Sequence, residues 1–237
     1  MLCALAALLL LGACQHVRPP EPGAAQLAQE GEAAFQRKKW TKAVDAFQKL
    51  KDRYPFSPYA LTAEMKIADA LYLQENYEEA IVAYQEFERM HPRNESVPYA
   101  VFMQGMSNYR RLLTKDRDQT PTAEALRNFQ RLLTEYPESP LIEQARARIG
   151  ECQELMAAQE LYVARWYERT GHARSALARL KYVVANYPTT PSAEEARRLL
   201  SEVEAEVART AEKPVELAPG PAPIEGGSLE RTRRPVP

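Results

Sequence analysis

Three cysteines and three histidines are the residues of this chain best suited to nucleophilic chemistry or metal binding. They stand at Cys3, Cys14, Cys152, His16, His91 and His172. The histidines are scattered, without partners at metal-ligand spacing, and the chain holds no Ser/His/Asp, Cys/His or glycine-rich phosphate pattern. The acidic pairs Glu78-Glu79 and Glu194-Glu195 fall near expected helix starts, where the helix dipole favours them. We therefore predict no metal site, no cofactor and no catalysis.

Cys14 is the one member of this set whose neighbours predict a defined chemistry. Residues 1–12 are uncharged and mostly apolar, too short for a membrane-spanning helix of about 20 residues but typical of a signal-peptide core. Leu11-Gly12-Ala13-Cys14 resembles a lipobox. Small residues let the peptidase reach the bond, and the thiol is the nucleophile that takes a diacylglycerol. Cys14 is thus the predicted lipid-attachment site, and its lipid the predicted membrane anchor.

The residues around Cys14 also bear on where the protein works. Gln15 follows it; lipoproteins kept in the inner membrane often have Asp there, so the outer membrane, at its periplasmic face, is favoured. No Lys or Arg precedes the apolar stretch, which leaves open a start codon farther upstream, a plain secretory signal with a chance cysteine, or an uncleaved cytoplasmic adaptor. Once the signal is removed and Cys14 is acylated, Cys152 stands alone. We expect it to be a buried, unpaired thiol.

Composition indicates an all-α protein of ordinary surface charge. The 237 residues are 27% charged with a formal net charge of −1, which does not suggest a nucleic-acid partner. Ala, Leu, Glu, Gln and Arg, the strong helix formers, dominate. We divide the chain into a signal peptide (1–13), a Pro-rich tether (14–23), a helical domain (24–211) and a Pro/Gly-rich tail predicted to be disordered (212–237).

A repeated pattern organises the helical domain. Four aromatic-Pro pairs punctuate it: Tyr54-Pro55, His91-Pro92, Tyr136-Pro137 and Tyr187-Pro188. Twelve residues before each Pro stands an alanine, and apolar residues stand eight and five before. These offsets share one helix face, and the Pro ends the helix. The alanines are Ala43, Ala80, Ala125 and Ala176; the apolar residues are Phe47, Tyr84, Phe129 and Leu180, then Leu50, Phe87, Leu132 and Val183.

An earlier helix precedes each of these, so that the units resemble the tetratricopeptide repeat. Small residues at Gly31, Ala68 and Ala164 are expected to face the repeated alanines and let antiparallel helices approach closely. The Pro-to-Pro spacings of 37, 45 and 51 residues exceed the family's usual length. We assign the excess to a longer turn over residues 110–122 and to residues 141–169, read as one long helix or two with a bend near Gly150. The prediction is a right-handed superhelical solenoid of about four helix pairs, capped by a helix over about 191–210.

Several segments resemble one family more closely, the BamD lipoproteins of the β-barrel assembly machine. They are Arg53–Tyr59 (RYPFSPY), Tyr99–Gly105, Asp116–Gln119 (DRDQ), Tyr162–Gly171 and Tyr187-Pro188 with Thr190. The resemblance implies a scaffold that binds a BamA-like barrel insertase through its C-terminal repeats. It further implies contacts with other lipoproteins of the complex, and reading of unfolded outer-membrane proteins by the N-terminal repeats. The tail after Lys213 departs from the family. A pilotin for secretins or pili, or a cell-wall coordinator, is the alternative.

Aromatic residues supply the candidate binding sites. Phe56, Tyr59 and Tyr72 cluster around the first two units and are predicted to line a peptide groove, since aromatics make good anchors. Tyr54 is expected to pack between units instead. Trp166 and Tyr167 adjoin each other on one helix, so that one is expected in the core and the other at a partner interface.

Overall fold

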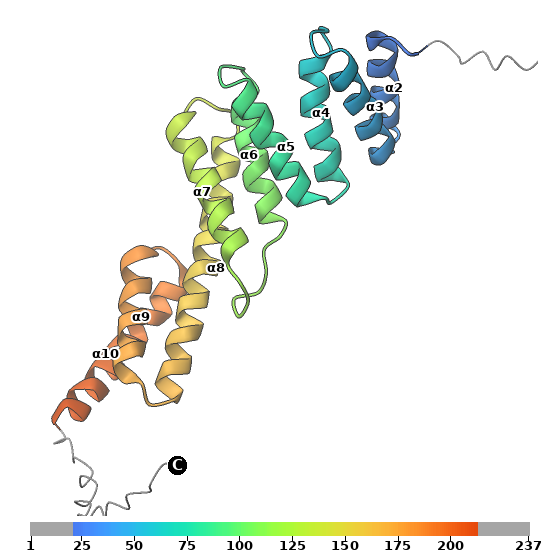
Figure 1. The fold of residues 1–237 in the computed structure, drawn as a ribbon. Helices are drawn as coiled ribbons and strands as arrows, with labels where there is room; N and C mark the ends of the chain where they lie inside the picture. Colours follow the sequence, from blue (N-terminus) through green and yellow to red (C-terminus); the bar gives the residue numbers. More distant parts are fainter. Residues whose placement is uncertain (1–20, 213–237) are drawn as a thin grey trace, which may run out of the picture.

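The computed structural model describes residues 21–212, and all its regular structure there is helical (Figure 1). The helices are α2 (Ala24–Gln36), α3 (Trp40–Arg53), α4 (Ala60–Leu73), α5 (Tyr77–Met90), α6 (Val97–Tyr109), α7 (Thr120–Glu135), α8 (Ile142–Arg169), α9 (Ala173–Asn186) and α10 (Pro191–Glu212). The predicted signal peptide, Cys14 and nearly all of the tail lie outside the described residues.

The helices form antiparallel pairs that stack into an elongated array (Figure 1). The pairs are α2/α3, α4/α5, α6/α7 and α8/α9, and α10 packs on both α9 and α8. The α3–α4, α5–α6 and α7–α8 connections all lie along one edge, the upper edge in Figure 1. This arrangement confirms the predicted all-α solenoid of four helix pairs with a closing helix.

The repeated positions form the core. The four alanines are fully buried, and the apolar residues eight and five before each Pro are buried as well. Each aromatic of the aromatic-Pro pairs lies just past a helix end, where its N–H donates to the carbonyl four residues earlier; in Tyr54 this bond to Leu50 is 2.8 Å. The following Pro has no N–H with which to continue the helix.

Two glycines permit a close approach of paired helices. A Cβ built on Gly31 would lie 2.6 Å from the Phe47 ring, and one on Gly105 would lie 2.6 Å from the Phe129 ring. Real side chains do not approach so closely, so a glycine is needed where each Phe packs against the preceding helix. Gly105 is therefore the third unit's counterpart of Gly31, which the longer turn in that unit concealed in the sequence.

The short turns within three pairs share a backbone conformation. Lys38, Glu75 and Gly171 have positive φ of 56°, 66° and 76°, the left-handed region that costs non-glycine residues about 1–2 kcal/mol. Each lies in the short connection between the two helices of its pair. Only the turn before α9 uses glycine, so the first two units carry a small strain that the fourth does not.

Helix α8 is the structural link between two hydrophobic cores. It continues through Gly150 as one helix of 28 residues, about 42 Å long at 1.5 Å per residue. Its first half buries Ala145 and Cys152 in a core shared with α4 to α7, and its second half buries Ala157 and Ala164 in a core shared with α9 and α10. Of the two alternatives for residues 141–169, the single helix is confirmed.

A buried polar cluster joins the second and third pairs. Tyr84 of α5 and Tyr99 of α6 both donate their hydroxyls to Oδ1 of Asp69 on α4, over 2.8 and 2.9 Å. Burial raises the pKa of the Asp69 carboxyl, although the two hydroxyls partly offset this. The cluster ties three helices to one atom, which fixes the stacking of these pairs.

Candidate partner-binding surfaces

The α3–α4 connection presents the most exposed aromatic residue among the described residues, Phe56, whose side chain is 99% exposed. Tyr54, two residues earlier, instead packs on the hydrophobic core shared by α2, α3 and α4 and donates its hydroxyl to the Pro22 carbonyl at 3.2 Å. The chain makes a tight turn between the two aromatic residues, in which the Ser57 N–H donates to the Tyr54 carbonyl at 3.0 Å. Tyr59, at the start of α4, is partly exposed beside this turn.

Tyr72 does not belong to the same surface. It lies near the other end of α4, about 20 Å from Tyr59 along the helix axis. Its ring meets the edge of Tyr77 at 5.5 Å between centroids, and its hydroxyl accepts a bond from Arg110 Nε at 3.0 Å. The structure thus brings Phe56 and Tyr59 together and places Tyr72 at the opposite edge of the solenoid.

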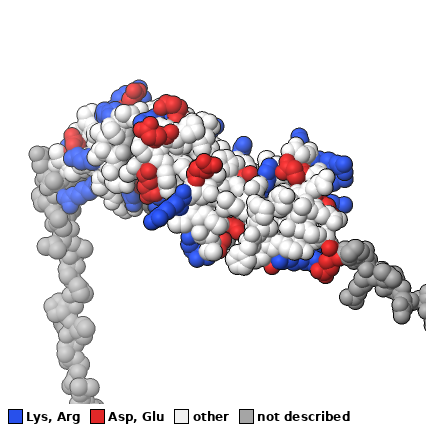
Figure 2. Space-filling view, turned by 90° about the horizontal axis from the view of Figure 1, so that it is seen from above, with Lys and Arg blue, Asp and Glu red and all other residues white. Residues whose placement is uncertain are grey.

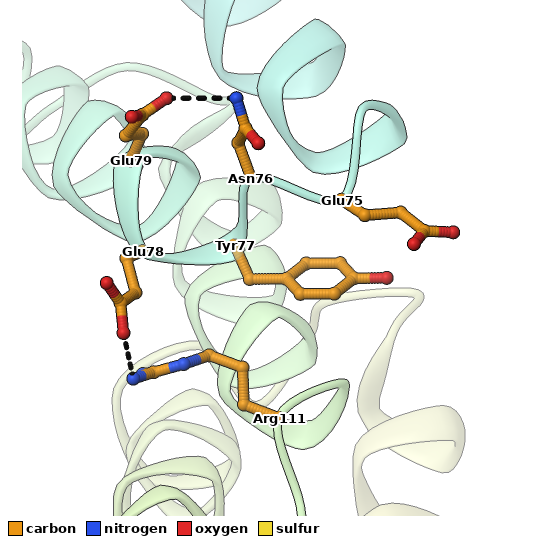
Figure 3. A pocket seen from close by; sticks show the side chains of 6 residues that line it. All are labelled: Glu75, Asn76, Tyr77, Glu78, Glu79 and Arg111. Carbon is orange, nitrogen blue, oxygen red and sulfur yellow. Dashed lines mark hydrogen bonds and ion pairs between the residues drawn. The ribbon is translucent and has the colours of Figure 1, made fainter.

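Beside Tyr72, the ends of α4, α5 and α6 enclose a polar hollow of about 360 Å³ (Figure 3). Three glutamates line it, and its one basic residue is Arg111, whose Nη2 binds Glu78 at 2.5 Å across the opening. Asn76 binds Glu79 on the far side, while the Tyr77 ring extends between Glu75 and Arg111 (Figure 3). Two of the three glutamates are thus paired, and the largely polar lining makes the hollow a poor site for an apolar peptide.

The long α6–α7 connection explains the DRDQ segment. Gln119 is buried; its amide donates to the carbonyls of Thr114 and Arg117 at 2.9 and 3.1 Å, and its oxygen accepts from Thr122 at 2.7 Å. Asp118 accepts bonds from the N–H and hydroxyl of Thr120, which hold the pKa of its carboxyl below the usual value. These two residues close the loop and start α7.

A second aromatic surface lies on the C-terminal half of α8. Tyr167 packs against the core shared with α9 and α10, whereas Trp166 is 48% exposed. Tyr162, one turn earlier on the same face, is 42% exposed. The His172 ring lies nearly parallel to the Trp166 indole, with an interplanar angle of 12° and 6.4 Å between ring centroids. The sequence had not singled out Tyr162, although its spacing of four from Trp166 is the signal that would have found it.

Chemically reactive groups are sparse in the part of the chain that the structure describes. Residues 21–212 hold no group of three or more His, Cys, Asp or Glu able to bind a metal. Cys152 is buried, and burial raises the pKa of its thiol to about 12, so it stays protonated and unreactive. No described helix combines the length and apolarity needed to cross a membrane.

Charge is evenly distributed over the face that carries the upper-edge connections. Figure 2, seen from that side, shows basic and acidic side chains interspersed among broad uncharged areas. Strong attraction to a polyanion requires a concentrated basic surface. This face therefore carries no concentrated basic surface among the described residues.

The stacked helix pairs and exposed aromatic surfaces define a tetratricopeptide-type repeat protein. The chain belongs to the YfiO family of outer membrane lipoproteins, whose model matches residues 20–216. Relatives named outer membrane protein assembly factor BamD include one from Vibrio cholerae, 27% identical over 204 residues, covering 81% of this chain and 85% of the relative. One from Caulobacter vibrioides is 28% identical over 166 residues, covering 70% of this chain and 54% of that relative, about half its length. The resemblance to BamD proteins is thereby confirmed.

Two solved structures to which this chain is similar, both at TM-scores below 0.5, are repeat proteins. The TPR2AB domain of yeast Sti1, in complex with pHSP90, is 14% identical with a TM-score of 0.47, covering 79% of this chain and 72% of that one. A tetratricopeptide repeat protein of Parabacteroides merdae is 14% identical with a TM-score of 0.40, covering 79% and 76%.

Proposed function

We propose that this chain is a non-catalytic scaffold lipoprotein that helps assemble β-barrel proteins in the outer membrane. The observation that carries the proposal is the family match over residues 20–216, which spans the whole described solenoid. The relatives' common name, outer membrane protein assembly factor, supports the same role here. The fold suits it, because stacked helix pairs offer extended surfaces to other chains.

The two aromatic surfaces have separate roles in this proposal. Phe56 and Tyr59, on the N-terminal pairs, anchor apolar segments of unfolded outer-membrane proteins. Such segments carry an apolar residue at every second position, and full burial of an exposed Phe contributes about 1.5–3 kcal/mol. Trp166 and Tyr162 form the contact for a BamA-like barrel insertase, since exposed aromatics held rigidly make binding hot spots. Other lipoproteins of the complex are further proposed partners.

Crosslinked pull-down from cell envelopes tests the partner assignment. The double variant Trp166→Ala/Tyr162→Ala is expected to recover at least tenfold less barrel insertase, because losing one hot-spot aromatic costs about 2 kcal/mol or more. Tyr182→Ala is the matched control, since Tyr182 is 46% exposed on α9. Recovery of a secretin, or of no barrel-assembly protein, by the unaltered chain would overturn the function.

The substrate surface and the anchor have their own tests. Phe56→Ala/Tyr59→Ala is expected to weaken binding of peptides with alternating apolar residues and to leave insertase recovery unchanged; the reverse result contradicts the division of roles. The proposed lipid on Cys14 predicts that globomycin makes a precursor accumulate and that Cys14→Ala releases the protein from membranes. Persistent membrane binding of Cys14→Ala would exclude the lipid anchor.

A further inference from the structure

An apolar pocket of about 460 Å³ lies between the α5–α6 and α7–α8 connections, on the upper edge in Figure 1. Tyrosine, proline and leucine side chains make its apolar lining: Pro98, Tyr99, Tyr136, Pro137, Pro140 and Leu141. The pocket is separate from both aromatic surfaces described above. Its volume is enough for two or three side chains of an extended segment.

The charged residues that line this pocket are all acidic. They are Glu95 on the α5–α6 connection, Glu135 at the end of α7 and Glu138 on the α7–α8 connection. All three are exposed, and among the described residues only Glu135 has a close cation, Arg131, at 3.6 Å. Arg131 binds Glu88 more closely, at 2.7 Å. The rim therefore keeps a negative charge that a cationic ligand would neutralise.

This combination selects a particular ligand chemistry. Grooves lined by tyrosine and proline take proline-rich segments, whose extended form loses little entropy on binding. Carboxylates beside such a groove favour arginine, because guanidinium groups form charge-assisted, often bidentate bonds with them. An arginine followed by proline and an aliphatic residue meets both requirements.

We propose that the pocket binds residues 231–237 of the same chain, Arg-Thr-Arg-Arg-Pro-Val-Pro. Its three arginines complement the three glutamates of the rim, and Pro235, Val236 and Pro237 complement the apolar lining. The docked segment occupies the upper edge of the solenoid and competes with any partner that approaches there. The inference is independent of the proposed assembly function.

The chain is long enough for this contact. Ser192, near the start of α10, binds Glu154 of α8, so the path from the pocket to the end of α10 follows part of α8 and then α10. At 1.5 Å per residue this path is about 50 Å. Residues 213–230, extended at about 3.3 Å per residue, reach about 60 Å. The segment can therefore arrive at the pocket without unfolding α10.

A fluorescence-anisotropy competition tests the proposal with a labelled peptide of residues 228–237. The protein is the full chain in detergent, either unaltered or with Arg231→Ala/Arg233→Ala/Arg234→Ala. The altered chain is expected to bind the peptide saturably. The unaltered chain is expected to bind it at least fivefold more weakly, because its own segment competes at high effective concentration.

Variants of the rim identify the pocket. Glu95→Gln/Glu138→Gln, added to the triple-alanine chain, is expected to weaken peptide binding about tenfold or more. Glu168→Gln/Glu202→Gln makes the same charge change on α8 and α10 and should have no effect. The proposal is overturned if the triple-alanine chain binds the peptide equally well with and without Glu95→Gln/Glu138→Gln. It is also overturned if the unaltered and triple-alanine chains bind the peptide equally well. A competition effect that disappears on dilution also overturns it, since that result assigns the segment to a second copy.

Discussion

The contact between Gly105 and Phe129 gives the sharpest test of how the helix pairs pack. Changing Gly105 to Ala places a Cβ 2.6 Å from a Phe ring that is fully buried. Overpacking of this kind costs about 1–3 kcal/mol, and the better helix propensity of alanine returns about 1 kcal/mol. Because Phe129 is fully buried, we expect the overpacking to outweigh the gain in helix propensity, with a net destabilisation of up to about 2 kcal/mol.

Two other glycines provide the comparison. Gly31→Ala meets the Phe47 ring at the same distance, but its helix α2 is the first described helix and packs mainly on α3, with lesser contacts to α4 such as Lys66 over the Phe35 ring. That helix can move outward, so a smaller loss is expected. Gly150→Ala meets nothing within 4 Å and should stabilise the chain by about 0.5–1 kcal/mol. Size and sign of the three effects thus follow from the space around each glycine.

Urea unfolding followed by circular dichroism measures the three midpoints at constant m-value. The double variant Gly105→Ala/Phe129→Leu adds a thermodynamic cycle. Leucine removes the ring atoms that the new methyl would meet, so the Gly105→Ala change should cost less in that background. If Gly105→Ala instead stabilises as much as Gly150→Ala, the close approach of α6 and α7 is refuted.

Three further predictions concern single positions. Gly171→Ala forces a side chain into φ of 76° and should cost about 1 kcal/mol in urea unfolding; an unchanged midpoint would contradict the turn. The raised pKa of Asp69 means that its protonated form is favoured by folding, so stability should fall as pH rises from 3.8 towards the folded pKa. Asp69→Asn should lack this fall, as pH-dependent unfolding would show. Burial raises the pKa of the Cys152 thiol to about 12, so it should react with iodoacetamide at pH 8 only after urea unfolding. Mass spectrometry of a chain with Cys3 and Cys14 changed to Ser measures the labelling. Rapid labelling of the folded chain would exclude the burial of Cys152.

Much of the fold could be predicted because each repeat is defined by residues close together in the sequence. The alanine twelve residues before each Pro and the apolar residues behind it define a helix face by spacing alone. The position of Gly105 could not be found in that way, because the longer α6–α7 connection shifts the third unit out of phase. In the structure, Gly105 nevertheless lies against Phe129, as Gly31 lies against Phe47 in the first unit.

The candidate surfaces were less predictable, since exposure depends on the direction in which each connection leaves its helix. Tyr54 and Phe56 are two residues apart, yet one packs on the core and the other is fully exposed. Counting along α4 separates Tyr72 from Tyr59, but nothing in the sequence says which side the next pair covers. Likewise, the buried role of Gln119 exists only because the loop folds back on it.

The continuity of α8 has a consequence for the two aromatic surfaces. A helix turns by about 100° and rises 1.5 Å per residue, so the number of residues between Cys152 and Ala157 sets the angular phase of one half of the protein against the other. Inserting a single residue there would swing Trp166 by about 100° relative to Phe56. Seven inserted residues would nearly restore the phase while lengthening the molecule by about 10 Å. The number of residues in α8 therefore sets the relative orientation of the two aromatic surfaces.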